Sequence, residues 1–235
     1  GESRIPETFW VLERLGILER LRSSRFVRKE SVQFVTGTGK LSEPFYFPDH
    51  KDHESSRTWQ VLRSELDQML LDHTRSKGTT VKEETTVKEL LRENGRVVGV
   101  RAQHKDGSLA EYRAPITLDC TGKEAFAAVR SGWRTRDPYL NKVAVWTYYK
   151  GSKREPGIDE GQTAVAYVPD KGWFWHIPQH NNRVSVGVVA DGKYLTRGGL
   201  KDPQAIFERE IPSNKWIQDR LATGRCTGEY WLTAE

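Results

Sequence analysis

The stretch that decides the fold is Trp173-Phe174-Trp175-His176-Ile177-Pro178. It places two of the chain's eight tryptophans within three residues. Side chains alternate between the two faces of a strand, so Trp173 and Trp175 are expected on one face, where aromatic side chains usually pack within a sheet. Because proline cannot donate a ladder hydrogen bond, we expect the strand to end at Ile177. Taken alone, the pattern predicts a sheet strand rather than a site.

More strands are predicted on both sides of this one. Alternating apolar and polar residues separated by turn-forming residues predict strands over 31–47, 142–150, 163–168, 172–177 and 183–189, with a turn at 179–182. Two short helices are predicted at 202–209 and 215–221. These elements predict a large antiparallel sheet with helices on one side.

A separate group of elements is predicted between residues 61 and 122. Apolar residues at helical spacing indicate a helix over 61–71. Asn94-Gly95 joins two alternating segments within residues 80–100 and indicates a type I′ hairpin turn, and a turn at 105–107 predicts a third strand. The chain then reaches Asp119-Cys120-Thr121-Gly122. A glycine is expected at position 122 if the backbone approaches a ligand closely or adopts a positive φ.

One nucleotide-binding signature is absent from the sequence. No G-x-G-x-x-G opens a strand-to-helix turn, the arrangement that holds the pyrophosphate of FAD. Gly37-Thr38-Gly39-Lys40 lies between predicted strands, so we interpret it as a hairpin or loop. We therefore expect this chain by itself to bind FAD weakly, because the amide donors at a helix N-terminus are missing.

The beginning of the chain carries two further motifs. Gly1-Glu2-Ser3-Arg4-Ile5-Pro6 is followed by Phe26-Val27-Arg28-Lys29, which leads into the predicted strand at 31. By composition alone Lys29 would be a solvated surface lysine, since the chain has 37 Lys and Arg residues. The order and spacing of the motifs favour a functional role for it instead.

Together these segments resemble flavin-dependent halogenases, the tryptophan halogenase-like family. Residues 173–178 match its W-x-W-x-I-P signature, residues 1–6 resemble its G-E-S-x-x-P loop, and residues 26–29 resemble the F-x-x-K segment that carries its essential lysine. Residues 63–70 resemble the R-x-x-L-D-x-x-L helix of flavin hydroxylases, and residues 119–122 are similar to their D-A-S-G turn near the flavin nucleotide.

The resemblance implies a fold and a division into domains. The expected class is α/β (mixed α+β), a partial flavin hydroxylase-like FAD/NAD(P)-binding fold with a large antiparallel substrate-domain sheet. Residues 1–30 and 51–135 are assigned to the FAD-binding domain, and residues 31–50 and 136–235 to the substrate domain. The chain is expected to be an internal part of a longer enzyme, lacking the first nucleotide-binding unit and the last third, and to be inactive in isolation.

The resemblance also implies a reaction. FADH2 from a flavin reductase, dioxygen and chloride or bromide would give hypohalous acid, which Lys29 would deliver to a small aromatic or carrier-protein-bound substrate. The implied cofactor-binding residues are Gly1, Glu2, Ser3, Arg63, Asp119 and Gly122. The implied residues separating flavin from substrate are Trp173, Trp175, Ile177 and Pro178. Residues 141–147 look closer to the phenol and carrier-dependent branches than to the tryptophan branch.

A lysine can act on hypohalous acid in two ways. A neutral amine can form a haloamine, whereas hydrogen bonding to the oxidant does not require a neutral amine. With an unperturbed pKa near 10.4, about one lysine in 2,500 is neutral at pH 7. Burial among apolar and aromatic side chains raises that fraction. The sequence leaves both roles open for Lys29.

Two alternatives remain from the residues alone. A flavin monooxygenase or a prenyl-lipid reductase would share residues 63–70 and 119–122, although such enzymes usually lack the tryptophan strand and this lysine. A binding module without chemistry is the alternative from another class.

The composition of the chain limits the classes of partner that we expect it to bind. The chain has 235 residues, a formal charge of +5 and 29% charged residues, with a mean hydropathy of -0.69. Acidic and basic residues alternate without a block of five like charges, which argues against nucleic acid. Cys120 and Cys226 are too few for a disulfide framework, the six histidines form no metal motif, and no apolar run is long enough to span a bilayer. We expect no metal, no membrane partner and a cytoplasmic location.

Overall fold

The computed structural model describes residues 1–137 and 139–234. The chain forms two compact units, one built from residues 1–70 and the chain from residue 140 onward, the other from residues 71–139. Each unit is described by itself. The assignment of the sequence to FAD-binding and substrate domains stays a prediction, and Pro138 and Glu235 of the predicted second range lie outside the described residues.

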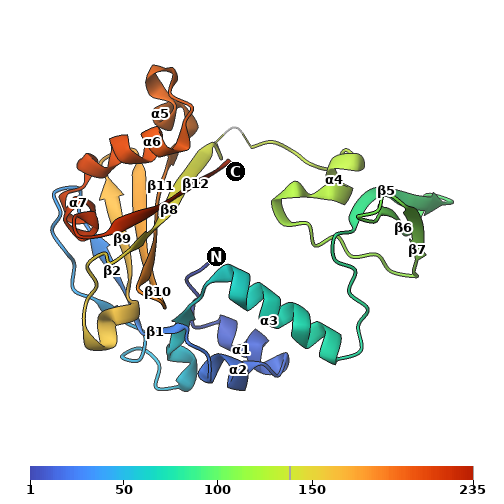
Figure 1. Ribbon diagram of the computed structural model, residues 1–235, viewed down its shortest axis with the longest axis horizontal. Coiled ribbons are helices and arrows are strands. Elements are labelled where there is room, and N and C mark those ends of the chain that lie inside the picture. Colours follow the sequence, from blue (N-terminus) through green and yellow to red (C-terminus); the bar gives the residue numbers. More distant parts are fainter. Residues whose placement is uncertain (138, 235) are drawn as a thin grey trace. The chain divides into compact units, whose positions relative to one another are not determined.

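A seven-stranded sheet dominates the first unit, in the order β12-β8-β11-β10-β9-β2-β3 (Figure 1). All neighbouring strands are antiparallel except β2 and β9, which are parallel. The large, mostly antiparallel sheet predicted from the sequence is confirmed. Its strands are β2 (Ser31–Val35), β3 (Phe45–Tyr46), β8 (Lys142–Lys150), β9 (Thr163–Val168), β10 (Gly172–Gln179), β11 (Arg183–Asp191) and β12 (Arg225–Ala234).

One face of this sheet is covered by helices α5 (Gly192–Leu195), α6 (Pro203–Glu210) and α7 (Lys215–Leu221) (Figure 1). Every second residue of β8 is buried, as expected for a strand with one covered face. The side chains of Asp202 and Asn214 cap α6 and α7 by accepting backbone N–H bonds. The core under the helices contains Val145, Phe174, Val186, Val188, Ile206, Phe207, Trp216 and Ile217.

The sequence misplaced some boundaries of this sheet. Residues 31–47 form two strands with a turn between them. The expectation that β10 stops before Pro178 is wrong, because the strand continues to Gln179 and pairs Pro178 with Val184 of β11. The ladder between β9 and β10 ends at His176, so Pro178 lies where β10 has a partner on one side only, a position that tolerates proline. Strand β12 was not predicted.

A second core in the same unit surrounds a two-stranded sheet, β1 (Val27–Lys29) and β4 (Thr58–Gln60). Helices α1 (Thr8–Arg14), α2 (Leu18–Arg22) and α3 (Arg63–Ser76) contribute to it, and α3 confirms the helix predicted around 61–71. Its buried residues are Phe9, Leu12, Ile17, Leu18, Leu21, Phe26, Trp59, Val61 and Leu66. The amino-terminal segment joins β4 through an antiparallel bridge between Ser3 and Gln60.

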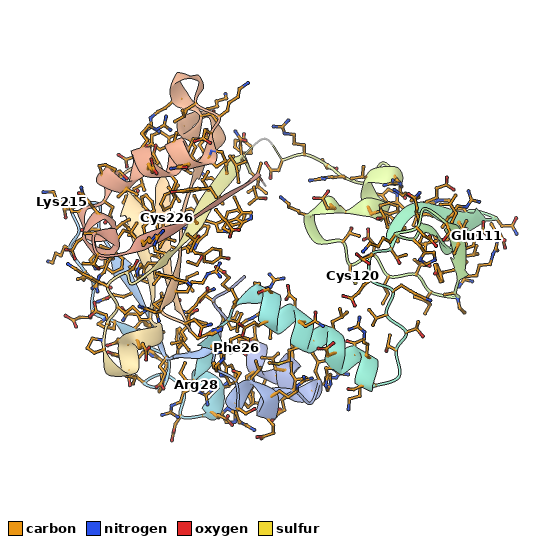
Figure 2. All side chains as sticks on the ribbon, in the orientation of Figure 1. Phe26, Arg28, Glu111, Cys120, Lys215 and Cys226 are labelled. Carbon is orange, nitrogen blue, oxygen red and sulfur yellow. The ribbon has the colours of Figure 1, made fainter. Side chains whose placement is uncertain are left out.

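The second unit holds a three-stranded meander of β5 (Thr86–Glu93), β6 (Arg96–Gln103) and β7 (Leu109–Arg113), followed by α4 (Phe126–Arg130). Asn94 and Gly95 both have positive φ, as a type I′ turn requires, so the predicted hairpin is confirmed. Both cysteines of the chain are free, Cys120 in this unit and Cys226 on β12 of the first (Figure 2).

No helix of the described residues is long and apolar enough to cross a bilayer. Within residues 1–137 and 139–234, no three His, Cys, Asp or Glu side chains gather in a way that could hold a metal ion.

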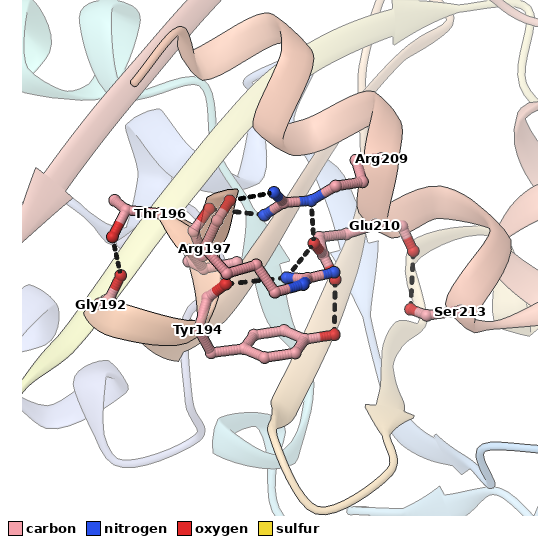
Figure 3. Close-up of polar contacts among 8 residues, drawn as sticks. Gly192, Tyr194, Thr196, Arg197, Arg209, Glu210 and Ser213 are labelled. Atoms are coloured by element: carbon pink, nitrogen blue, oxygen red, sulfur yellow. Dashed lines mark hydrogen bonds and ion pairs between the residues drawn. The ribbon is translucent and has the colours of Figure 1, made fainter. Parts of the chain in front are cut away.

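A buried carboxylate joins α5 to α6 (Figure 3). Glu210 is 1% exposed and accepts bonds from Arg197 Nη1 at 2.7 Å, Arg209 Nε at 2.9 Å and the Tyr194 hydroxyl at 2.8 Å. Arg209 also donates to the carbonyl of Leu195 at 2.6 Å. Burial raises the pKa of Glu210, but the three hydrogen bonds outweigh burial and hold the pKa below its ordinary value.

Glu210→Gln should therefore destabilise the protein by about 2 kcal/mol at pH 7, because two arginines lose their counter-ion. Because the pKa of Glu210 is lower in the folded state, its carboxylate stabilises the protein above the ordinary glutamate pKa, near 4.3. This stability is lost as the pH falls through the pKa of Glu210 in the folded state. Urea unfolding at pH 7 and pH 3 measures the free energy of unfolding of wild type and variant. The difference between the two proteins should close at the lower pH. Glu208→Gln, an exposed neighbour on α6, is the control, and a difference of equal size at both pH values would contradict the assignment.

Candidate functional site

Lys29 is buried at the end of β1. It pairs with Thr58 of β4, and its side chain is only 4% exposed. Its Nζ lies 2.8 Å from Ser3 Oγ and donates to the carbonyl of Arg4 at 3.1 Å. The ring centroid of Phe47 lies 5.3 Å from Nζ. The surface-lysine interpretation is therefore wrong.

The electrostatics of this position lower the pKa of the Lys29 amine. Burial lowers the pKa of Lys29 to about 8, and no carboxylate contributes to the shift. Because the charged amine loses its hydration on burial and forms no ion pair with a carboxylate of the described residues, its pKa falls below that of an ordinary lysine. With a pKa of about 8, roughly one Lys29 in ten is neutral at pH 7, compared with about one in 2,500 for an ordinary lysine.

A chain of hydrogen bonds extends from Lys29 into the sheet. Ser3 Oγ lies 2.8 Å from Thr163 Oγ1 on β9. Gln60 Nε2 donates to Thr163 Oγ1 at 2.8 Å and to the carbonyl of Gly161 at 2.7 Å. A Cβ at residue 161 would lie 1.8 Å from the carbonyl oxygen of Arg28, so glycine is required for this close approach to β1.

Glu2, the neighbour of Ser3, ties the amino-terminal segment to the tryptophan strand. Its Oε1 accepts from Tyr148 on β8 at 2.7 Å and from Gln179 at the end of β10 at 2.9 Å. The guanidinium of Arg183 stacks over the Tyr148 ring at 3.6 Å. Burial, followed by the bond to Glu2, raises the pKa of Tyr148, so this hydroxyl remains a donor at neutral pH.

The two signature tryptophans lie on the sheet face opposite the helices. Phe174 and His176 alternate with them and contact Phe207 of α6 and Trp216 of α7. Trp173 is 39% exposed, whereas Trp175 is half-buried. The prediction that both share one strand face is confirmed.

Trp175 is held by its neighbours on β11 and β8. Its Nε1 donates to Ser185 Oγ at 3.1 Å. Its register partner is Gly187, where a Cβ would approach the indole to 2.3 Å and the Cβ of Trp146 to 2.6 Å. Trp146 in turn stacks on Trp231 of β12, with 6.0 Å between ring centroids. Glycine at position 187 therefore makes room for the indole.

The candidate cofactor residues fall into two groups. Gly1, Glu2, Ser3 and Arg63 belong to the first unit, where Arg63 forms an ion pair with Asp67 at 2.9 Å and contributes to the electrostatic environment of the Gly1 amine. The side chains of Glu2 and Ser3 are committed to the internal bonds described above, and the Glu2 carbonyl accepts from the Val61 N–H at 2.8 Å.

Asp119 and Gly122 belong to the second unit. Asp119 accepts from the backbone N–H groups of Thr121 at 3.0 Å and Ala127 at 2.7 Å, which orders the turn. Gly122 has a φ of +61°, and the space a Cβ would occupy is open. A glycine in this conformation with open space above it fits the close approach of a nucleotide to the backbone.

Sequence reasoning missed several residues of this site. Gln60, Thr163 and Tyr148 carry no motif, and their roles follow from long-range pairing. Two signals were available in the sequence: an isolated glycine within a strand, which marks a close approach at Gly187, and the strand alternation that places Trp146 and Tyr148 on one face.

Comparison with known proteins gives one family. The family pattern described as tryptophan halogenase matches residues 43–208. A flavin-dependent halogenase of Armillaria mellea is 29% identical over 196 residues, which cover 80% of this chain and 38% of that protein. The 1H-pyrrole-2-carbonyl-[peptidyl-carrier protein] chlorinase of Pseudomonas fluorescens is 24% identical over 244 residues, covering 94% and 54%.

Solved structures give the same result. The myxobacterial chondrochloren halogenase, described as FAD-dependent, has a TM-score of 0.84 at 28% identity. The match covers 100% of this chain and 55% of the halogenase chain. The flavin-dependent halogenase CmlS has a TM-score of 0.86 at 27% identity, with 42% of its own chain covered. The chain thus spans about half the length of these relatives, or less. The predicted flavoprotein fold and family are confirmed.

The packing of the two tryptophans predicts different energetic contributions. Trp175→Ala should destabilise the first unit by roughly 3 kcal/mol, because it removes a half-buried indole and its bond to Ser185. Trp173→Ala, on the same strand face but more exposed, should cost less than Trp175→Ala. Urea unfolding followed by circular dichroism compares the free energies of unfolding of the two variants. An equal decrease in both would show that the two indoles are packed alike.

Proposed function

This chain belongs to the tryptophan halogenase family, and on that premise we propose that the protein containing it is a flavin-dependent halogenase. It uses FADH2 supplied by a flavin reductase, dioxygen and chloride or bromide, and it transfers the halogen to an electron-rich substrate. The observation that carries the proposal is Lys29, a buried amine without a counter-ion beside the G-E-S loop.

Binding of FAD is assigned to the residues that the resemblance implies. Gly1, Glu2 and Ser3 would contribute backbone groups, Arg63 a cation, and Asp119 and Gly122 an ordered turn with open space. When bound and reduced, FAD supplies the two electrons that convert dioxygen, halide and protons into hypohalous acid and water.

Lys29 captures the hypohalous acid. Its neutral amine attacks the halogen, an N–halogen bond forms, the oxygen–halogen bond breaks, and water leaves with the displaced proton. The halogen is then held at Nζ for transfer to carbon. The lowered pKa supplies the lone pair that this step needs near neutral pH. Orientation of the oxidant by a charged Lys29 is the competing role.

The role we assign to β10, the strand with the two tryptophans, is to keep the organic substrate away from the flavin. Trp173, Trp175, Ile177 and Pro178 separate the flavin from the organic substrate, so that halide is oxidised first. This proposal is supported by the contacts of Trp175. Its hydrogen bond to Ser185 and its packing against Gly187 fix the position of the indole on this face of the sheet.

The substrate class is a small aromatic compound or an acyl group on a carrier protein. The relatives include halogenases whose names specify a pyrrole-2-carbonyl group on a peptidyl-carrier protein. Residues 141–147 favour the phenol and carrier-dependent branches. A cytoplasmic location fits the two free cysteines.

Lys29→Ala in the intact enzyme should abolish halogenated product while flavin reoxidation by oxygen continues. Lys29→Arg should not restore the product if a haloamine is formed, because the guanidinium stays protonated. Product analysis by mass spectrometry and flavin reoxidation by absorbance are measured on the same preparation.

The exposed Lys105 provides the matched control, and Lys105→Ala should halogenate normally. Substantial product from Lys29→Arg would favour the orienting role over the haloamine. Normal halogenation by Lys29→Ala would remove Lys29 from the reaction.

A further inference from the structure

A small cavity lies on the helix side of the seven-stranded sheet, next to α7. Its volume is about 10 Å³, which is about the space that one ordered water molecule needs. Two arginines, Arg154 and Arg220, line it together with Trp216 of α7 and His176 of β10. The cavity can therefore hold one monatomic ligand and is too small for a polyatomic anion such as sulfate.

Four buried nitrogen atoms of these residues have no hydrogen-bond partner among the described residues. They are Nε of Arg154, Nε of Arg220, Nε1 of Trp216 and Nε2 of His176. The two guanidinium N–H groups and the indole N–H can only donate. Because buried donors are normally paired with protein, water or an ion, this cavity needs a ligand that accepts hydrogen bonds.

The surrounding contacts hold these donors in place. Nη2 of Arg154 donates to two backbone carbonyls, at the end of β10 and at the start of β11, and Nη2 of Arg220 pairs with Glu155. The Arg220 guanidinium lies 4.8 Å from the centre of the Trp216 ring. The His176 ring meets the same indole edge to face, with 5.3 Å between ring centroids. Trp216 and Arg220 are one helical turn apart on α7 and so share a face.

The charges at the cavity favour an anion. Burial, followed by the charges of Arg220 and Arg154, lowers the pKa of His176 to about 3, and only a backbone hydrogen bond acts in the opposite direction. At this imidazole, therefore, the two arginines are not offset by a carboxylate of the described residues. His176 stays neutral, and a neutral imidazole can carry its hydrogen on Nε2 and donate it.

Two carboxylates also line the cavity, and both are engaged by other groups. Asp159 accepts from the hydroxyls of Ser31 and Tyr46 at 3.1 and 2.8 Å, and Glu155 accepts from Arg220. Water is the competing occupant of the cavity. A water molecule makes about three hydrogen bonds and must donate its own two hydrogens, whereas three groups here can only donate. A halide accepts from all three and donates nothing.

We propose that this cavity is a binding site for a single halide ion, chloride or bromide, held by the N–H groups of Arg154, Arg220 and Trp216. His176 faces the helices, whereas the two signature tryptophans lie on the opposite face of the sheet. The ion held here is thus a structural one, separate from the halide that the proposed reaction oxidises. Because it joins β10, α7 and the loop after β8, its binding stabilises the first unit.

The direct test is a crystal of the wild-type chain soaked in sodium bromide. We expect an anomalous bromide peak in the cavity, within hydrogen-bonding reach of Arg154 Nε and Arg220 Nε. Density without an anomalous signal, refined as a water molecule, would overturn the proposal.

Urea unfolding followed by circular dichroism tests the site in solution. The unfolding equilibrium constant of the wild type should fall about tenfold for each tenfold rise in bromide above the dissociation constant. Trp216→Phe removes the indole N–H and keeps an aromatic ring beside His176. Because a hydrogen bond to a charged group is lost, this variant should need about ten times more bromide, or more, for the same effect. Sodium sulfate at equal ionic strength should affect both proteins alike.

The matched control is Trp10→Phe. Trp10 also contacts a histidine ring and a cation, with 5.1 Å to the ring centroid of His53 and 5.0 Å to Nζ of Lys51, but it lies on α1 and does not line the cavity. This variant should keep the bromide dependence of the wild type.

An equal bromide dependence in wild type and Trp216→Phe would contradict the halide site. If Trp216→Phe does not fold, the bromide peak in wild-type crystals decides the question by itself. These measurements need no flavin, oxygen or organic substrate, so their outcome is independent of whether Lys29→Ala abolishes halogenation.

Discussion

The first unit buries one amine, that of Lys29, without a carboxylate partner among the described residues. An ammonium removed from water must find compensation, and Lys29 finds a hydroxyl, a carbonyl and an aromatic ring instead of a carboxylate. Burial therefore lowers the pKa of this amine to about 8, which raises its neutral fraction near pH 7. A carboxylate at this place would have stabilised the ammonium and removed the lone pair.

This constraint explains why distant parts of the sequence meet at β1. Ser3 is brought to Lys29 by the bridge to Gln60, and Gly161 lets the segment before β9 pack directly on the backbone of β1. Glu2 extends the same contact to β8 and β10 through Tyr148 and Gln179. The G-E-S loop thus connects the amine on one side with the tryptophan sheet on the other.

Much of this architecture could be predicted from local patterns. Strand alternation gave the sheet and the shared face of Trp173 and Trp175, and Asn94-Gly95 gave the hairpin because its backbone conformation is set by two residues. Boundaries were less predictable: Pro178 continues β10 because its neighbour β9 has already ended, which depends on tertiary pairing. Lys29 was predicted as a candidate from its motif. The contacts of Thr163 and Gln60 could not be predicted, because nothing in their own sequence surroundings differs from ordinary strand residues.

The sequence separations within the hydrogen-bond chain link chemistry to folding. Ser3 and Thr163 are 160 residues apart, and Gln60 and Thr163 are 103 apart. Contacts of such separation form only after long loops have closed, which makes them late and slow compared with helices and hairpins. Until then Lys29 is hydrated and protonated like any other lysine. The lowered pKa of this amine is a consequence of its burial, so the chain acquires it only when these contacts have formed.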